Sequence, residues 1–169
     1  MGRSRRAGTL LVAFGLVLGA AFASGCRTGG TGGTGSRGPS KFAPGAHAVT
    51  TNGVRVELTT ARYRETGVDL RLQIDNREGT PVLVQRQGLV LAYEDLEFPA
   101  TAVGDTPLPD TTEVPGKGQQ TIEVRFDLGG RITAEATLKL RAVQRGQTWL
   151  EPIELTIPGG IDPEKRVEP

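Results

Sequence analysis

The fold of this chain is indicated most clearly by one stretch, residues 68–75, which reads Val68-Asp69-Leu70-Arg71-Leu72-Gln73-Ile74-Asp75. Every second residue is a branched aliphatic one, and each residue between them is charged or polar. Successive side chains of a β-strand point to opposite faces of the sheet, so such a strand has one apolar and one polar face. The stretch therefore predicts a strand of an antiparallel sheet that packs one face on a core and exposes the other to water.

The same two-residue period recurs on both sides of this stretch. It is found in residues 54–58, 122–128, 136–142 and 153–157, and two shorter apolar runs lie at 82–85 and 89–93. Turn-forming residues separate these runs, and no segment carries a helical apolar stripe over three turns. About seven short strands of this kind predict an all-β chain folded as an immunoglobulin-like antiparallel β-sandwich. We expect this domain to span residues 47–159, with residues 160–169 as a C-terminal tail.

One order of features within the predicted domain resembles known families. A strand ending in Ile74-Asp75-Asn76 is followed by Thr80-Pro81-Val82, and Pro115-Gly116 precedes a strand that ends in Phe126. In this order, residues 49–128 resemble the immunoglobulin-like domains of secreted bacterial lipoproteins and the water-stress domains of late-embryogenesis proteins. The resemblance implies a sandwich fold and brings no catalytic residue with it.

The first 25 residues have the three-part plan of a secretory signal peptide. Arg3, Arg5 and Arg6 form a positive start, and residues 7–23 are uncharged and rich in Leu, Val, Ala and Phe. Small residues follow and precede Cys26, the only cysteine of the chain. This order is typical of a segment that directs export and is then removed. With a single cysteine, no disulfide can form within the chain.

The end of this segment, Ala23-Ser24-Gly25-Cys26, resembles the lipobox of bacterial lipoproteins. The resemblance implies cleavage between Gly25 and Cys26, a diacylglyceryl thioether on Cys26 and acylation of the new amino terminus. Two or more acyl chains on one residue hold a protein firmly to a bilayer, whereas one chain binds only marginally. The lipid bilayer is therefore an expected partner. Because Arg27 replaces the Asp that usually signals retention in the inner membrane, we expect the outer membrane in a diderm cell.

Residues 26–46 are expected to be a flexible tether that follows the anchor. Beyond Cys26 they are mostly Gly, Thr, Ser, Arg, Ala and Pro, a composition that behaves as a flexible coil. The literal G-x-G-x-x-G of Gly30–Gly35 has no strand before it and no helix after it, so it predicts no nucleotide cofactor. Three of the 20 basic residues and none of the 19 acidic ones precede Cys26, so the formal charge falls from +1 to −2 after cleavage. This balance argues against a nucleic-acid partner.

The residue types of the domain argue against most catalytic chemistry. All four serines precede residue 47, and His47 is the only histidine. A Ser-His-Asp or Cys-His site cannot be assembled from these residues, and zinc or copper sites need several His or Cys ligands. We expect His47 to be a solvated residue at the domain's edge. No catalytic residue, metal site or cofactor is therefore predicted.

A group of carboxylates is the candidate binding loop. Its members are Glu94, Asp95, Glu97, Asp105 and Asp110. Their oxygens are the ligands that calcium prefers, and a carboxylate pair could also serve glycoside hydrolysis. A calcium-stabilised domain and a carboxylate-dependent envelope enzyme are thus two alternatives. The preferred hypothesis is a membrane-anchored, non-catalytic binding or structural module of the cell envelope with a protein partner there, in which Trp149 packs in the core or closes the sandwich.

Overall fold

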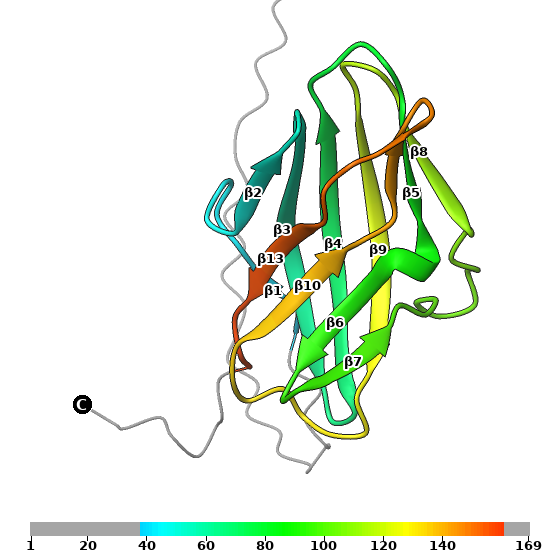
Figure 1. The fold of residues 1–169 in the computed structure, drawn as a ribbon. Helices are drawn as coiled ribbons and strands as arrows, with labels where there is room; N and C mark the ends of the chain where they lie inside the picture. The colour runs from blue at the N-terminus through cyan, green and yellow to red at the C-terminus, as the bar shows by residue number, and fades with distance from the viewer. Residues whose placement is uncertain (1–37, 161–169) are drawn as a thin grey trace, which may run out of the picture. The chain divides into compact units, whose positions relative to one another are not determined.

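The structure is a computed structural model that describes residues 38–160, and these residues form an all-β domain with two facing layers (Figure 1). The first layer is a five-stranded antiparallel sheet in which β3 and β4 are the longest strands. Its strands are β1 (Ser40–Lys41), β2 (Ala48–Thr51), β3 (Val54–Arg64), β4 (Gly67–Asn76) and β9 (Gln119–Asp127). Both β1 and β2 pair with one edge of β3, and β9 pairs with β4 on the far side.

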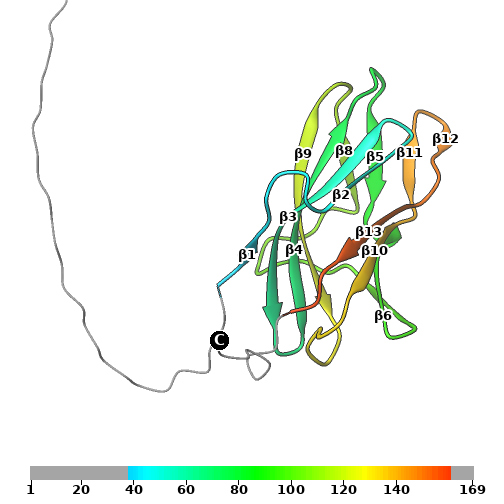
Figure 2. The same ribbon diagram turned by 90° about the vertical axis from the view of Figure 1, so that its left-hand side faces the viewer.

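Two four-stranded sheets face the first layer, as the side view shows (Figure 2). One is ordered β13 (Ile153–Ile157), β10 (Ala136–Leu140), β6 (Leu89–Tyr93) and β7 (Leu96–Pro99). The other is ordered β12 (Thr148–Trp149), β11 (Val143–Arg145), β5 (Val82–Gln85) and β8 (Thr111–Val114). The chain passes from β5 to β6 through a single 3₁₀ turn, Arg86–Gly88, and from β10 directly into β11.

Two backbone hydrogen bonds link these sheets where the chain crosses between them. The Gln85 N–H donates to the Ala142 carbonyl at 2.9 Å, and the Arg141 N–H donates to the Gly88 carbonyl at 2.8 Å. A Cβ on Gly88 would lie 2.4 Å from the Ala142 nitrogen, so only glycine fits this crossing. The pairs β5–β6 and β10–β11 are therefore two long bent strands that lie side by side.

Counted with these bent strands, the strand order is that of an immunoglobulin-like sandwich. β3, β4 and β9 take the places of strands A, B and E, and they face β5–β6, β10–β11 and β13 in the places of C, F and G. The predicted all-β sandwich is thus confirmed. The number of separate strands is larger than seven because the bends divide two of them and short edge strands are added.

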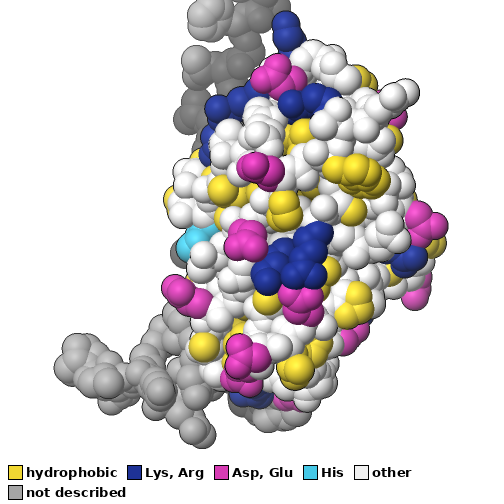
Figure 3. Space-filling view, viewed as in Figure 1, with side chains coloured by type: hydrophobic (Ala, Val, Ile, Leu, Met, Phe, Trp, Pro, Cys, Tyr) yellow, Lys and Arg dark blue, Asp and Glu magenta, His cyan; other side chains and the backbone are white. Residues whose placement is uncertain are grey.

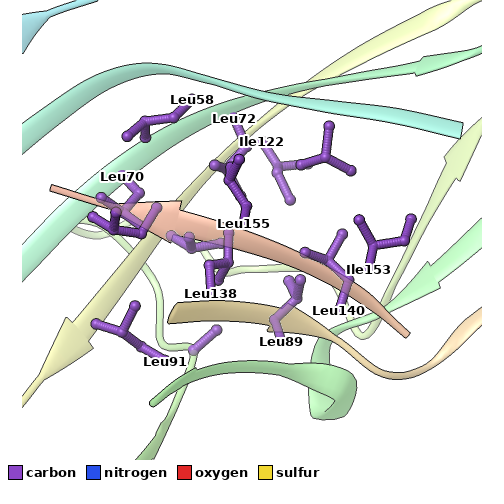
Figure 4. Close-up of a cluster of buried hydrophobic side chains, with 14 of the residues drawn as sticks. Leu58, Leu70, Leu72, Leu89, Leu91, Ile122, Leu138, Leu140, Ile153 and Leu155 are labelled. Carbon is purple, nitrogen blue, oxygen red and sulfur yellow. The ribbon is translucent and has the colours of Figure 1, made fainter. Parts of the chain in front are cut away.

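The core lies between the two layers and is built from the alternating residues (Figure 4). Val68, Leu70, Leu72 and Ile74 are each at most 1% exposed, while the residues between them reach the surface. Leucine and isoleucine side chains from β6, β10 and β13 point at them from the other layer. The sequence period of two therefore becomes one continuous apolar seam.

The folded domain begins before residue 47, which differs from the predicted boundary. Ser40 and Lys41 pair with Ala61 and Thr60 on β3, and Phe42 packs against the core. His47 is half-buried, with its ring 4.7 Å from that of Phe42 in an edge-on arrangement. At least residues 40–46 of the predicted tether thus belong to the sandwich, because β1 pairs with β3, Phe42 packs against the core and the Gly45 N–H donates to the Glu57 carboxylate.

The far end of the domain is fixed by contacts around Tyr63. Its hydroxyl donates a hydrogen bond to the Pro158 carbonyl, and burial raises the pKa of Tyr63 to about 12. The Gly160 N–H donates to the Ile132 carbonyl at 3.0 Å, so the chain stays attached to the domain up to the first residue of the predicted tail. The predicted signal segment 1–25, Cys26, residues 27–37 and residues 161–169 lie outside the described residues. Within residues 38–160, no helix has the length and apolar character needed to span a bilayer.

Candidate functional site

The predicted acidic loop is in fact a tight turn followed by a strand. Glu94 and Asp95 are the two central residues of the β6–β7 hairpin, with φ angles of 49° and 63°. Two positive φ values are the mark of a type I′ turn, whose twist matches that of paired strands. Both residues are exposed, so their carboxylates point into solvent at a hairpin tip.

The remaining acidic residues of the predicted loop are held at different places. Glu97 on β7 accepts hydrogen bonds from Lys139 on β10 at 3.2 Å and from Arg141, the residue directly after β10. Over this face, Lys and Arg side chains lie next to Asp and Glu side chains (Figure 3). Asp110 instead forms an ion pair with Arg86 at 2.7 Å, and Asp105 is exposed in the connection between β7 and β8.

The five carboxylates are therefore not brought together into one site. Across residues 38–160, no group of three or more His, Cys, Asp or Glu side chains is placed to hold a metal ion. The sequence grouped these residues because they are close along the chain, whereas the β6–β7 hairpin and the connection to β8 separate them in space.

The Glu97 ion pairs give a first prediction, a small acid dependence of stability. The hydrogen bond from Arg141, then that from Lys139, holds the pKa of Glu97 below its usual value. A carboxyl whose folded-state pKa is lowered stabilises the fold above its unfolded pKa, near 4.3, and this contribution is lost as the pH falls through the folded value. We expect Glu97→Gln to lower the free energy of unfolding slightly at pH 7 and not at pH 3. Urea unfolding at both pH values measures this.

Glu94→Gln is the matched control for that measurement, because Glu94 makes no salt bridge to a described residue. Equal losses for the two variants at pH 7, or a loss for Glu97→Gln that persists at pH 3, would contradict the assignment.

The described part of the chain carries an open pocket of about 500 Å³ at the other end of the sandwich. The tip of the β11–β12 hairpin lies at this end, opposite the β6–β7 hairpin (Figure 2). Three segments contribute to the pocket: the β2–β3 turn, the β4–β5 loop, and the β11–β12 hairpin with the residues after it. Its lining residues are Asn52, Gly53, Glu78, Arg145, Thr148, Trp149, Leu150 and Glu151.

Trp149 is the exposed large hydrophobic side chain of this pocket. It is 55% exposed, so the expectation that it packs in the core or closes the sandwich is wrong. β12 has only two residues and pairs only with β11, an arrangement that carries the tryptophan outside the apolar seam. An indole ring beside an open pocket is a common element of binding surfaces, since it offers a large apolar face and one N–H donor.

A buried asparagine holds the loops beside the pocket in place. Asn76, at the end of β4, is fully buried, and its amide nitrogen donates to the carbonyls of Thr80 at 2.8 Å and Pro115 at 3.1 Å. Its side-chain oxygen accepts from the Glu78 N–H at 3.2 Å. Asn76 therefore ties the β4–β5 loop, which carries Glu78, to the β8–β9 loop.

Further backbone contacts hold the same loops. The Arg77 N–H donates to the Gly53 carbonyl at 2.9 Å, and the Lys117 N–H donates to the Glu78 carbonyl at 2.7 Å. A Cβ on Gly116 would lie 1.9 Å from the Gly79 carbonyl oxygen, so the two loops touch through their backbones. The pocket thus rests on loops that are fixed to one another.

Arg145 brings a positive charge to the pocket with few internal partners. Its terminal nitrogen lies 3.4 Å from the Asn76 side-chain oxygen, and its buried Nε has no hydrogen-bond partner among the described residues. Arg145 also forms no salt bridge with any residue of 38–160. An arginine has five N–H donors, so most of the hydrogen-bonding capacity of Arg145 is unused inside the domain.

The pocket was missed at the sequence level although local signals for it exist. Asn52-Gly53 is the preferred dipeptide of a type I′ turn, and both residues have positive φ values, 50° and 71°. Gly146, with φ 59°, makes the second hairpin that reaches the pocket. These turns could have been predicted, but their meeting in space depends on the pairing of β3 with β4 and of β11 with β5, which no local pattern reports.

Comparisons with known proteins give a fold likeness and no family. No protein-family model matches the chain, and no curated protein matches it. Among solved structures, it is similar to the ycdA protein, a candidate lipoprotein of Bacillus subtilis, with a TM-score of 0.55 and 9% identity. That match covers 66% of this chain and 38% of the ycdA chain, so this chain corresponds to less than half of that protein.

The yjhA protein of Bacillus subtilis is a second similar structure, with 7% identity, 57% of this chain and 78% of that chain covered, and a TM-score of 0.46. At such identities the likeness to ycdA shows a shared β-sandwich fold alone.

Proposed function

We propose that this chain is a lipid-anchored protein of the cell envelope whose immunoglobulin-like sandwich is a non-catalytic binding module. The observation that carries the binding role is the exposed Trp149 beside an open pocket whose loops are tied to one another. Loops at the end of a rigid sandwich are the usual place for binding residues, because the sheets hold them while their sequences are free to vary.

The anchoring role rests on the sequence Ala23-Ser24-Gly25-Cys26 after an uncharged apolar run. The similar ycdA protein is itself described as a candidate lipoprotein, which agrees with this proposal. Acyl chains on Cys26 would hold the domain at a membrane surface. Because Arg27 follows the cysteine, we propose the outer membrane where the cell has one.

The non-catalytic character is proposed from the residue types at the pocket. Its polar side chains are Asn52, Glu78, Arg145, Thr148 and Glu151, and none of them is His, Cys or Ser. A nucleophile needs a neighbouring base or a lowered pKa, and Thr148 has no such partner among the hydrogen bonds of the described residues. This set of side chains is suited to holding a ligand by polar contacts.

The anchor is tested by growing cells that express the full chain with a labelled fatty acid. We expect label on the wild-type protein and none on Cys26→Ser, together with a move of the variant from the detergent-rich to the aqueous phase on detergent partitioning. Ser24→Ala is the matched control, since it changes a neighbouring residue and keeps the cysteine. Equal labelling of the wild-type protein and Cys26→Ser would overturn the proposed anchor.

The binding role is tested with a photo-reactive residue placed at position 149 of the full chain in intact cells. Position 96 is the matched control, because Leu96 is the other exposed large hydrophobic residue among residues 38–160, 61% exposed, and lies at the opposite end of the sandwich. We expect a cross-linked product, either a protein or a glycan, from position 149 and not from position 96. No product from position 149, or the same products from both positions, would overturn the binding role of this end.

A further inference from the structure

We propose that the Trp149 pocket binds a neutral carbohydrate, with one face of a sugar ring lying on the indole and its hydroxyl groups bonded to the polar residues around it. This inference rests on the proposed binding role of the sandwich end and names its ligand class. It is argued from the size, the charges and the side chains of the pocket.

The size of the pocket suits a small ligand. The pocket has about 500 Å³, within the roughly 300–1,000 Å³ of small-molecule sites, and it is wide open, so a ligand in it would keep part of its surface in solvent. Of its three segments, the β2–β3 turn and the β4–β5 loop are joined by a backbone hydrogen bond, and the β11–β12 hairpin is held by the pairing of β11 with β5, so little ordering would be needed when a ligand binds. Preorganisation of this kind saves entropy that binding would otherwise cost.

The charges of the pocket favour a neutral ligand. Arg145 lies on one β-hairpin, while Glu78 and Glu151 lie on the segments beside it, and all three line the same space. An anion attracted by the guanidinium group would also meet two carboxylates, and a cation attracted by the carboxylates would also meet the guanidinium group, so the lining matches no single charge. A neutral ligand with many hydroxyl groups avoids both penalties, because each hydroxyl can accept from an arginine and donate to a carboxylate.

The indole of Trp149 supplies an apolar surface on which a sugar ring can lie. Sugar rings have a face of C–H groups, and the electron-rich face of an indole attracts such polarised hydrogens. Trp149 is 55% exposed and Leu150 beside it is half-buried, so an apolar surface is available next to the polar residues. Asn52 and Thr148 add uncharged donors and acceptors at the rim.

A protein surface fits these observations less well. A stable protein interface buries about 800 Å² on each partner and has an apolar centre rich in large side chains. At this end of the described domain, Trp149 is the only exposed large apolar residue, since the other one, Leu96, follows the distant β6–β7 turn. The surface around the pocket therefore lacks the continuous apolar area that a protein partner would cover.

The single tryptophan of the chain makes the test direct, because all tryptophan fluorescence comes from Trp149. The full chain, in a detergent without a sugar headgroup, is titrated with neutral trisaccharides of N-acetylglucosamine, glucose and mannose. Free lysine and inorganic phosphate serve as the cationic and anionic probes. We expect a saturable change with at least one neutral trisaccharide and none with lysine or phosphate.

Three variants, measured by calorimetry, separate stacking from charge. Trp149→Ala is expected to weaken binding of the responding sugar by about tenfold, since it removes the indole face on which the sugar ring lies. Leu96→Ala is expected to leave affinity unchanged. Glu151→Gln is expected to change it by less than about fivefold and to create no binding of phosphate.

The proposal is overturned if no neutral trisaccharide gives a saturable signal at 10 mM, roughly ten times a millimolar dissociation constant. It is also overturned if only lysine or phosphate binds, or if Trp149→Ala binds the sugar as well as the wild-type protein. If a protein is cross-linked at position 149 and no sugar binds, the carbohydrate proposal is overturned and the proposed binding role of this end is kept. If neither a cross-linked product nor sugar binding is found, the proposed binding role is overturned as well.

Discussion

Replacing Asn76 with alanine is expected to lower the free energy of unfolding by about 2–4 kcal/mol, because it removes a fully buried amide from several partly buried backbone groups. The side chain is fully buried and holds the carbonyls of Thr80 and Pro115 and the Glu78 N–H at once. Each buried group that loses its only side-chain partner costs about 1–3 kcal/mol, and part of this is recovered when water enters the space left.

Urea unfolding of the wild-type protein and the variant measures this loss as a lower midpoint at an unchanged slope. Gln73→Ala is the matched control, because Gln73 lies on the same strand and bonds only to Gln119 at the surface. We expect that control to change stability by less than about 0.5 kcal/mol. If Asn76→Ala were as stable as Gln73→Ala, the amide would not be what joins the two loops.

The same variant is expected to alter the pocket, since Asn76 fixes the loop that carries Glu78. Its side-chain oxygen also lies 3.4 Å from the terminal nitrogen of Arg145. Loss of the amide therefore releases two lining residues at the same time. Any ligand of the pocket should bind more weakly to Asn76→Ala than to the wild-type protein, even at temperatures where the variant is fully folded.

Much of the fold was predictable because the alternation of apolar and polar residues follows directly from which side chains a sheet buries. Val68, Leu70, Leu72 and Ile74 were expected on one face, and all four are buried. Charged residues between them leave only one register that keeps the apolar face inside, since a slip of one residue reverses the faces. Residues 122–128 in the same sheet and residues 136–142 and 153–157 in the facing layer follow the same rule, so the sandwich could be inferred without any homologue.

The edges of the sandwich were harder to predict, because short edge strands bury little surface. Ser40–Lys41 has no alternation to recognise, and its pairing with β3 is accompanied by the packing of one side chain, Phe42. The β6–β7 turn lacks the glycine that usually marks a type I′ turn, so Glu94 and Asp95 were grouped with acidic residues that lie elsewhere.

The candidate site depended on information that no local pattern contains. Trp149 is an aromatic residue near a strand, which ordinarily predicts burial. Its exposure follows from the two-residue length of β12 and from a position outside the seam, both properties of the tertiary pairing. The buried role of Asn76 is likewise set by loops that are distant in sequence, Thr80 on one side and Pro115 on the other.

Phe126 is the largest fully buried side chain of the domain, and its removal is expected to have the largest effect on stability. It lies near the end of β9 opposite Val68 on β4, in the layer that faces β6 and β10. Truncation of a buried phenylalanine to alanine removes its transfer free energy and leaves a cavity, a combined cost of about 3–5 kcal/mol. A domain of this size has a total stability of about 5–15 kcal/mol, so Phe126→Ala should be close to unfolding at 37 °C.

Phe42→Ala is the matched comparison for Phe126→Ala, because the chemical change is the same and only the burial differs. Phe42 is half-buried against the core and the ring of His47, so we expect a loss of about 1 kcal/mol, well below that of Phe126→Ala. Urea unfolding gives both values. A tether residue would show no loss at all, so a stable Phe42→Ala would return residues 40–46 to the tether. Equal losses for the two variants would contradict the full burial of Phe126 in the seam.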